Sequence, residues 1–143
     1  MRLEPGDVAC WVIKTSRPPE ALAPGWRRAE TRALRRCVRP SYRLDLMAPG
    51  QRCLLWLSGR VDPGVQAVGV LTAGPDAEPA VEVGLHLLDS PVERAELALL
   101  GDFAGAEVMR MPAGSNPSYL TDAQLRPVLD RLDAASRRAA GWD

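Results

Sequence analysis

Four tryptophans are the side chains of this sequence best suited to bind a planar ligand. Trp11 and Trp56 lie in apolar, strand-like stretches, Trp26 follows a Pro-Gly break beside arginines, and Trp142 is close to the C-terminus. The indole ring is the broadest platform on which a nucleobase can stack. A tryptophan inside a strand usually belongs to the core, so core and pocket wall are equally good interpretations of Trp11. Trp26, at a junction next to basic residues, is the stronger candidate for a ligand site.

Basic residues are concentrated in one part of the chain. Residues 14–43 hold nine of them against two acids, whereas in residues 76–107 the acids predominate. Apolar residues three and four apart predict a helix that starts near Trp26 and reaches Val38. Its polar face would carry Arg28, Arg32, Arg35, Arg36 and Arg39. Such a face can dock phosphates, and the alternative interpretation is an ordinary solvated helix surface.

Residues for catalysis are scarce. The sequence has no nucleophile elbow, no glycine-rich phosphate loop and no HExxH motif. We interpret the single histidine, His86, as a satisfied strand residue and the single lysine, Lys14, as the solvated end of a strand. Cys10, Cys37 and Cys53 show no CxxC spacing, which predicts free structural thiols. We therefore expect no enzyme, no metal site and no cofactor.

The apolar runs and turn signals predict one α+β domain over residues 1–143. Strands are expected at 8–14, 52–58, 65–71, 80–88 and 106–111. Residues 92–100 fit a helix or a strand equally well, and a short helical turn is expected at 42–47. Thr121 and Gln124 have the spacing of a capping box, which predicts a C-terminal helix from there. Hairpin links between strands favour a curved or closed sheet.

We expect a soluble, cytoplasmic protein. The 143 residues suit one domain, and 46% of them are hydrophobic. No apolar run approaches the roughly 20 residues that a membrane span needs. The first residues lack the order of a secretory signal, so we expect no membrane partner.

Three stretches in a fixed order resemble the EVE domain of the PUA superfamily, which is related to the YTH domains. They are WVIKTSRP at 11–18, PGQRCLLWLSG at 49–59 followed by GVQAVGV at 64–70, and MPAGSNPSYLT at 111–121. The resemblance extends over residues 8–132. It implies a PUA-like small mixed β-barrel of about five to six strands flanked by helices. It also implies recognition of a modified or flipped base in DNA or RNA through an aromatic pocket.

Carried over residue by residue, the resemblance implies two sets of site residues. The base pocket would comprise Lys14, Thr15, Ser16, Trp26, Trp56, Leu57, Ser58 and Asn116. Phosphates would be docked by the Arg-rich helix and its neighbours, through Arg17, Arg28, Arg32, Arg35, Arg36 and Arg110.

Two other functions remain open. The acidic residues of 76–107 would suit a protein-interaction module with a basic partner. A small enzyme acting on a nucleobase or nucleoside would use Lys14 or His86 to carry a proton. Only Tyr42, Tyr119 and Phe103 are left to complete an aromatic cage, so the ligand's identity is also open.

Overall fold

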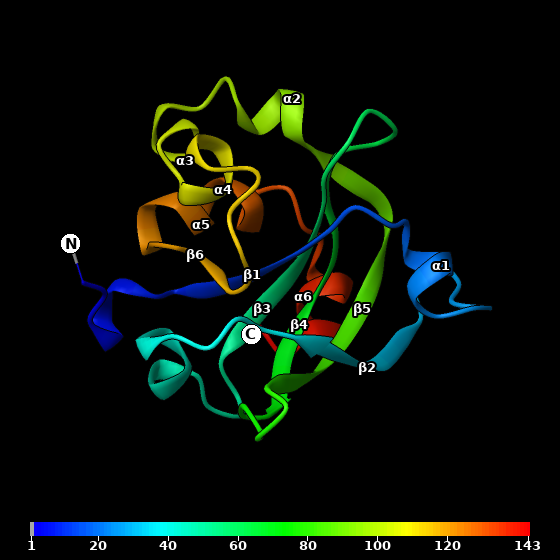
Figure 1. Ribbon diagram of the computed structural model, residues 1–143. Coiled ribbons are helices and arrows are strands. Elements are labelled where there is room, and N and C mark those ends of the chain that lie inside the picture. Colours follow the sequence, from blue (N-terminus) through cyan, green and yellow to red (C-terminus); the bar gives the residue numbers. More distant parts are fainter. Residues whose placement is uncertain (1) are drawn as a thin grey trace.

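The computed structural model describes residues 2–143 and contains one six-stranded sheet. The strands are β1 (Cys10–Thr15), β2 (Thr31–Cys37), β3 (Arg52–Leu57), β4 (Gly64–Ala73), β5 (Ala80–Glu93) and β6 (Ser118–Leu120). Their order in the sheet is β2-β5-β4-β3-β1-β6, with β1 and β3 parallel and the other pairs antiparallel. The sheet curls, and β2 crosses in front of it (Figure 1). Beyond β2, the Arg39 amide donates to the Asn116 carbonyl (2.9 Å), which links the two edges of the sheet.

Helices cover one side of the curled sheet (Figure 1). They are α2 (Arg94–Leu97), α3 (Gly101–Ala104), α4 (Glu107–Arg110), α5 (Asp122–Leu129) and α6 (Ala134–Ala140). The short helix α1 (Pro19–Leu22) lies apart from them, beside the start of β2. Two 3-10 helices span Pro5–Asp7 and Tyr42–Leu46. The expected α+β architecture of about six strands flanked by helices is confirmed. Among residues 2–143, no helix is long and apolar enough to cross a membrane.

The apolar side chains form two clusters because successive residues of a strand point to opposite faces. In β1, Trp11 and Ile13 belong to the barrel-side cluster, together with Trp26 and Leu55. Val12 belongs to the helix-side cluster, which also contains Trp56, Phe103 and Leu125. Both faces of β1 and β3 are therefore buried, which explains why these strands are continuous apolar runs in the sequence.

Strands β4 and β5 approach each other closely at a pair of glycines. A Cβ atom on Gly69 would lie 1.8 Å from the Gly84 carbonyl oxygen, so only glycine fits there. The Gly69 carbonyl also accepts a hydrogen bond from Nε1 of Trp142 (2.7 Å). The C-terminal tryptophan is thus buried against the sheet.

The helix predicted from Trp26 to Val38 is wrong, because residues 31–37 form the edge strand β2. This strand pairs with β5 along its whole length, from Thr31 opposite His86 to Cys37 opposite Ala80. Its side chains alternate, and Leu34 is its one buried residue. The sequence therefore has no Arg-rich helix. Its arginines are divided between the two faces of a strand, with Arg32 and Arg36 on the face of Leu34.

The other predicted elements have mixed outcomes. The strands predicted at 8–14, 52–58, 65–71 and 80–88 are confirmed, as is the helical turn at 42–47. The capping box is confirmed too, with Thr121 as the N-cap of α5 and Gln124 bonding back to it. The strand predicted at 106–111 is wrong, because these residues contain helix α4, and the last strand is the short β6. The undecided stretch 92–100 ends β5 and then forms α2.

Candidate functional site

The carboxyl ends of β1 and β3 lie side by side because the two strands are parallel neighbours. Lys14 lies opposite Trp56 and Thr15 opposite Leu57, and the Ser58 amide donates to the Thr15 carbonyl (2.8 Å). The residues that follow line a cavity of about 340 Å³, which we call the strand-end hollow. Its lining is Ser16, Pro18, Leu57, Ser58, Gly59, Arg60 and Val61. This volume is at the lower end of the range for small-ligand sites.

The loop of residues 111–117 is fastened to the last residues of β1. Oδ1 of Asn116 accepts from the Lys14 amide (2.7 Å), and its Nδ2 donates to the Lys14 carbonyl (3.0 Å). Residues 111–114 form a tight turn in which the Gly114 amide donates to the Met111 carbonyl (2.9 Å). Nζ of Lys14 donates to the same carbonyl (3.4 Å). A Cβ on Gly114 would lie 3.2 Å from that Nζ and 3.1 Å from the Met111 oxygen, so this close approach favours glycine.

An ion pair between Arg43 and Glu107 holds the end of this loop in place. The guanidinium of Arg43 donates to both carboxylate oxygens of Glu107 (2.8 and 2.7 Å) and to the Pro117 carbonyl (3.0 Å). The Ser118 hydroxyl donates to Glu107 Oε1 (2.9 Å). The hydrogen bonds from Arg43 are the largest cause of a lowered pKa of Glu107. The pair lines a second cavity of about 340 Å³, the loop hollow, together with Arg39, Met111, Ala113, Gly114 and Ser115.

The lowered pKa of Glu107 makes stability depend on pH in a defined direction. The pair's contribution is fully present above the ordinary carboxyl pKa of 4.5 and is lost as pH falls through the lower folded value. We expect Glu107→Gln to reduce the free energy of unfolding by about 1–3 kcal/mol at pH 7, with the difference shrinking at low pH. Urea unfolding of both proteins from pH 7 to pH 2 measures this.

The exposed Glu93 supplies the matched control, since it forms no ion pair within the described chain. Glu93→Gln should follow the wild-type pH profile. If the Glu107→Gln difference stayed constant down to pH 2, the ion pair would not be its cause.

Lys14 itself is buried, with 8% of its surface exposed, so the solvated strand end expected from the sequence is wrong. Burial is the largest influence on its pKa and lowers it, while the charge of Glu107 acts in the opposite direction. Thr15 closes the turn after the strand, because its hydroxyl accepts from the Arg17 amide (3.0 Å) and donates to the Arg17 carbonyl (3.2 Å).

Four of the nine cations in the basic stretch form ion pairs with carboxylates within the described chain, two of them with the same carboxylate. Glu30 pairs with Arg27 and Arg32, Asp76 and Glu78 pair with Arg35, and Glu107 pairs with Arg43. The other five form no ion pair with any carboxylate of residues 2–143. Arg28 donates instead to the Leu88 carbonyl (3.1 Å). The remaining four are Lys14, Arg17, Arg36 and Arg39.

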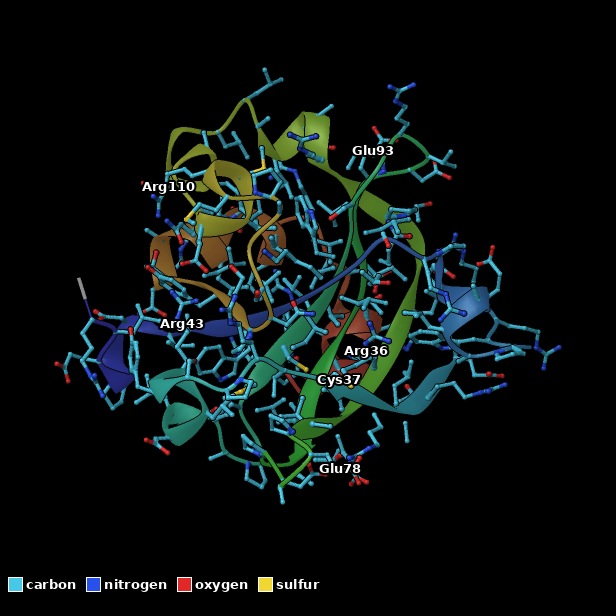
Figure 2. The ribbon with its side chains drawn as sticks, viewed as in Figure 1. Arg36, Cys37, Arg43, Glu78, Glu93 and Arg110 are labelled. Carbon is cyan, nitrogen blue, oxygen red and sulfur yellow. The ribbon has the colours of Figure 1, made fainter. Side chains whose placement is uncertain are left out.

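These four unneutralised cations belong to one region. Arg39 bonds to the loop through the Asn116 carbonyl (2.9 Å) and the Ser115 hydroxyl (3.4 Å), and Asn116 bonds in turn to Lys14. Arg36 has a buried Nε with no hydrogen-bond partner among the described residues. Burial lowers the pKa of Arg36, and the nearby positive charge of Arg17 lowers it further. Figure 2 shows Arg36 near the middle of the view, with Glu78 below it.

The structure brings most of the predicted base-pocket residues to one edge of the sheet. Lys14, Thr15, Ser16, Leu57, Ser58 and Asn116 all lie at the ends of β1 and β3 or on the loop bonded to them. Trp26 and Trp56, which were predicted to form walls of the base pocket, do not lie with these residues. Trp26 is buried in the barrel-side cluster, with its Nε1 donating to the Glu30 carbonyl (2.8 Å). Trp56 is buried in the helix-side cluster, stacked on Phe103 with ring centroids 5.7 Å apart.

The strand-end hollow therefore lacks an aromatic cage. Trp26 and Trp56 pack in different clusters on opposite faces of the sheet. So far as residues 2–143 form them, the walls of the hollow are the aliphatic side chains of Pro18, Leu57 and Val61, the hydroxyls of Ser16 and Ser58, and Gly59 and Arg60.

The predicted phosphate-binding residues are divided in the structure. Arg32 and Arg35 are held by carboxylates. Arg28 donates to a backbone carbonyl, as does Arg110 to that of Gly105 (2.9 Å), and Arg110 lies apart from Arg36 in Figure 2. Arg17 also donates to a backbone carbonyl, that of Ala21 (2.8 Å), but it has no carboxylate partner in the described chain, and Arg36 has a buried Nε without any partner there. Arg39, which the sequence placed on the basic face of the expected helix but which the family resemblance did not include among the phosphate-docking residues, also has no carboxylate partner within residues 2–143.

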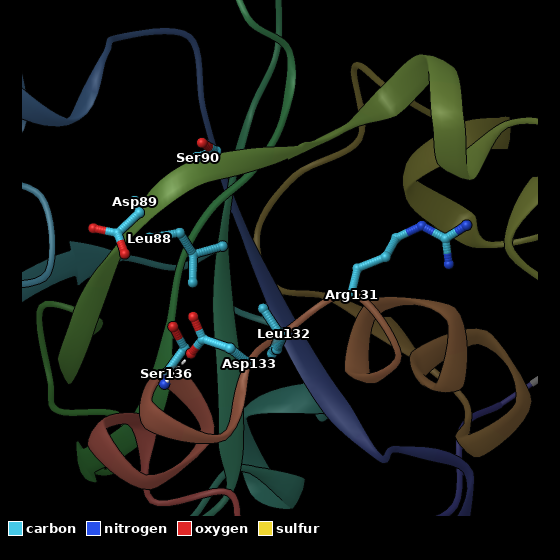
Figure 3. A pocket seen from close by; sticks show the side chains of 7 residues that line it. All are labelled: Leu88, Asp89, Ser90, Arg131, Leu132, Asp133 and Ser136. Carbon is cyan, nitrogen blue, oxygen red and sulfur yellow. Dashed lines mark hydrogen bonds between the residues drawn. The ribbon is translucent and has the colours of Figure 1, made fainter.

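A third cavity lies on another part of the surface, where β5 passes the start of α6 (Figure 3). It encloses about 220 Å³ and is lined by Leu88, Asp89, Ser90, Arg131, Leu132, Asp133 and Ser136. Asp133 caps α6 by accepting from the Ser136 amide (2.7 Å), and this bond is the main cause of its lowered pKa. In Figure 3 the side chain of Arg131 extends away from the two carboxylates, and it pairs with Glu96. The cavity is thus acidic and ill suited to phosphate.

Comparison with known proteins identifies the fold. No family model and no curated protein matches the sequence. Among solved structures, a hypothetical protein from Leishmania major matches 89% of this chain and 96% of its own, with a TM-score of 0.65 and 15% identity. A protein from Pseudomonas syringae matches 85% of this chain and 98% of its own (TM-score 0.62, 14% identity).

A third similar structure is that of the human THYN1 protein in complex with 5-methylcytosine containing DNA. It matches 87% of this chain and 98% of its own, with a TM-score of 0.51 and 14% identity. At these identities the likeness establishes architecture. The chain has a PUA-like fold, with one curled six-stranded sheet flanked by helices.

Proposed function

We propose that this chain is an EVE-type nucleic-acid-binding domain that holds a modified or flipped base at the carboxyl end of β1 and acts by binding rather than by catalysis. One observation carries the proposal. Four cations without a carboxylate partner, Lys14, Arg17, Arg36 and Arg39, gather where the polar lining of the strand-end hollow begins. Elsewhere in the same basic stretch, Arg27, Arg32, Arg35 and Arg43 are neutralised.

The electrostatics of this region favour an anionic ligand. Partly buried cations without counter-charges cost free energy, and the lowered pKa values of Lys14 and Arg36 express that cost. The buried, unpartnered Nε of Arg36 is a donor that a phosphate oxygen would satisfy. Binding a phosphate backbone here would offset the repulsion between Arg36 and Arg17.

The hollow supplies the features that a base requires. The hydroxyls of Ser16 and Ser58 can donate to or accept from a base edge, and they make no hydrogen bond to residues 2–143. The aliphatic walls would favour a base that carries an extra methyl group, since burying one CH₂ or CH₃ contributes about 0.8 kcal/mol. THYN1, of the same fold, is seen with 5-methylcytosine containing DNA, so methylated cytosine is the first ligand to test.

The test is a titration of fluorescently labelled oligonucleotides, single- and double-stranded, as DNA and as RNA. Each is prepared with unmodified cytosine, methylated cytosine, hydroxymethylated cytosine or methylated adenine. We expect one modification to bind best, and Ser58→Ala to reduce that preference by about tenfold, the effect of one lost hydrogen bond. Ser90→Ala, in the acidic cavity, is the control and should change nothing. Equal affinity for all bases, or no binding, would contradict the proposal.

The acidic cavity supports a second candidate function, docking of a basic protein. Asp76 and Glu78 are already paired with Arg35, whereas Asp89 has no ion pair within residues 2–143 and lines this cavity beside Asp133. This function predicts partner binding that is lost in Asp89→Lys and retained in Arg36→Ala.

The buried Lys14 supports a third candidate, a small enzyme acting on a nucleobase. Its lowered pKa is a property that a proton carrier uses. Turnover of a modified nucleoside that disappears in Lys14→Met, with nucleoside binding retained, would establish that function.

A further inference from the structure

We propose that the turn at residues 111–114 is an apolar wedge that enters the base stack of double-stranded DNA while one base occupies the strand-end hollow. The inference rests on the proposed function and adds to it the class of nucleic acid, a duplex from which the protein extracts the base. The residue that would enter the stack is Met111.

Met111 is a large apolar side chain that is exposed to solvent beside the candidate site. Three large hydrophobic side chains are exposed in the described part of the chain: Leu99 (85%), Val61 (76%) and Met111 (55%). Val61 lines the strand-end hollow and Met111 lines the loop hollow, so two of the three border the candidate site. Pro112 and Ala113 are exposed as well, which makes the tip of the turn apolar. An apolar tip among cations is the arrangement with which proteins separate base steps.

The turn is held in place before any ligand binds. The Met111 amide donates to the Glu107 carbonyl (2.7 Å), and its carbonyl accepts from the Gly114 amide (2.9 Å) and from Lys14 Nζ (3.4 Å). Asn116 fixes the far side of the loop to the backbone of Lys14. A wedge whose backbone is already ordered loses little further conformational entropy on insertion.

The charges beside the turn suit the phosphates on either side of a base step. Lys14 contacts the turn directly, and Arg39 lines the same hollow as Met111. Ser16, two residues after Lys14, lines the strand-end hollow, so wedge and base site are joined through the end of β1. Methionine is flexible and polarisable, and it can fill the irregular gap that a displaced base leaves.

The test compares Met111→Ser with Leu99→Ser on two forms of one DNA sequence, single-stranded and duplex, each carrying the same modified base. Both substitutions remove an exposed apolar side chain, but only Met111 borders the site. We expect Met111→Ser to weaken duplex binding by about tenfold and to change single-strand binding by less than about twofold, since only the duplex must be unstacked. Leu99→Ser should leave both affinities unchanged.

A second readout reports on the stack itself. A 2-aminopurine placed next to the modified base should brighten when the wild-type protein binds the duplex and should stay dim with Met111→Ser. Equal weakening of both DNA forms would make Met111 a simple wall of the site and overturn the wedge, and so would unchanged duplex affinity. Failure of the wild-type protein to bind even the single strand would instead overturn the proposed function on which the wedge rests.

Discussion

Replacing Arg17 and Arg36 together by alanine is expected to weaken binding of a modified oligonucleotide by about 10- to 100-fold. The affinity should also depend less steeply on salt: the magnitude of the negative slope of log affinity against log salt should fall by about two, close to one for each phosphate that is no longer neutralised. The reason is that neither guanidinium has a carboxylate partner within residues 2–143, so each is free to replace a counterion of the nucleic acid. Affinities measured at four or five salt concentrations give both quantities.

The matched control is Arg32→Ala with Arg35→Ala, two arginines of the same strand whose charges are neutralised. Arg32 pairs with Glu30 (2.9 Å), and Arg35 pairs with Asp76 (2.5 Å) and Glu78 (2.8 Å). Removing them should change the salt slope little. Equal reductions of affinity in the two double variants would mean that overall positive charge, rather than these particular cations, determines binding.

Trp56→Ala is expected to lower the free energy of unfolding by about 3–5 kcal/mol, as for other large aromatic residues removed from a core. Only 3% of the Trp56 surface is exposed, and its ring stacks on Phe103 beneath the helices. Trp56→Phe keeps an aromatic ring on Phe103 and should cost less. Urea unfolding followed by circular dichroism measures both variants.

The opposite result would revise the site. If Trp56→Ala were nearly as stable as the wild type but bound all bases equally, the indole would be a pocket wall, as the family resemblance implies. The aliphatic lining of the strand-end hollow would then be only part of the base site.

The sequence predicts well those elements whose own residues form a characteristic local pattern. Strands β1 and β3 are buried on both faces and are continuous apolar runs, and the capping box of Thr121 and Gln124 is a local pattern. Strand β2 carries no such signal. Its apolar residues also fit a helical spacing, and the β5 edge that makes it a strand is supplied by residues 80–86, far along the chain.

The site is less predictable than the fold because it depends on interactions between distant residues. Whether an arginine is free for phosphate depends on its partners: Asp76 is 41 positions from Arg35, and Glu107 is 64 from Arg43. No local pattern reveals which charges are neutralised. Likewise, the alternation in β3 places Trp56 on one of two faces, but only the packing of Phe103 and the helices shows that this face is closed.

The most direct test of the proposed site is a map of backbone amide shifts, recorded by NMR on labelled protein titrated with a short oligonucleotide carrying the preferred base. We predict that the largest shifts fall at residues 14–17, 58–61 and 111–116 and at Arg36, with the acidic cavity at Asp89 and Asp133 unaffected. Shifts centred on that acidic cavity, or spread evenly over the surface, would contradict the proposal.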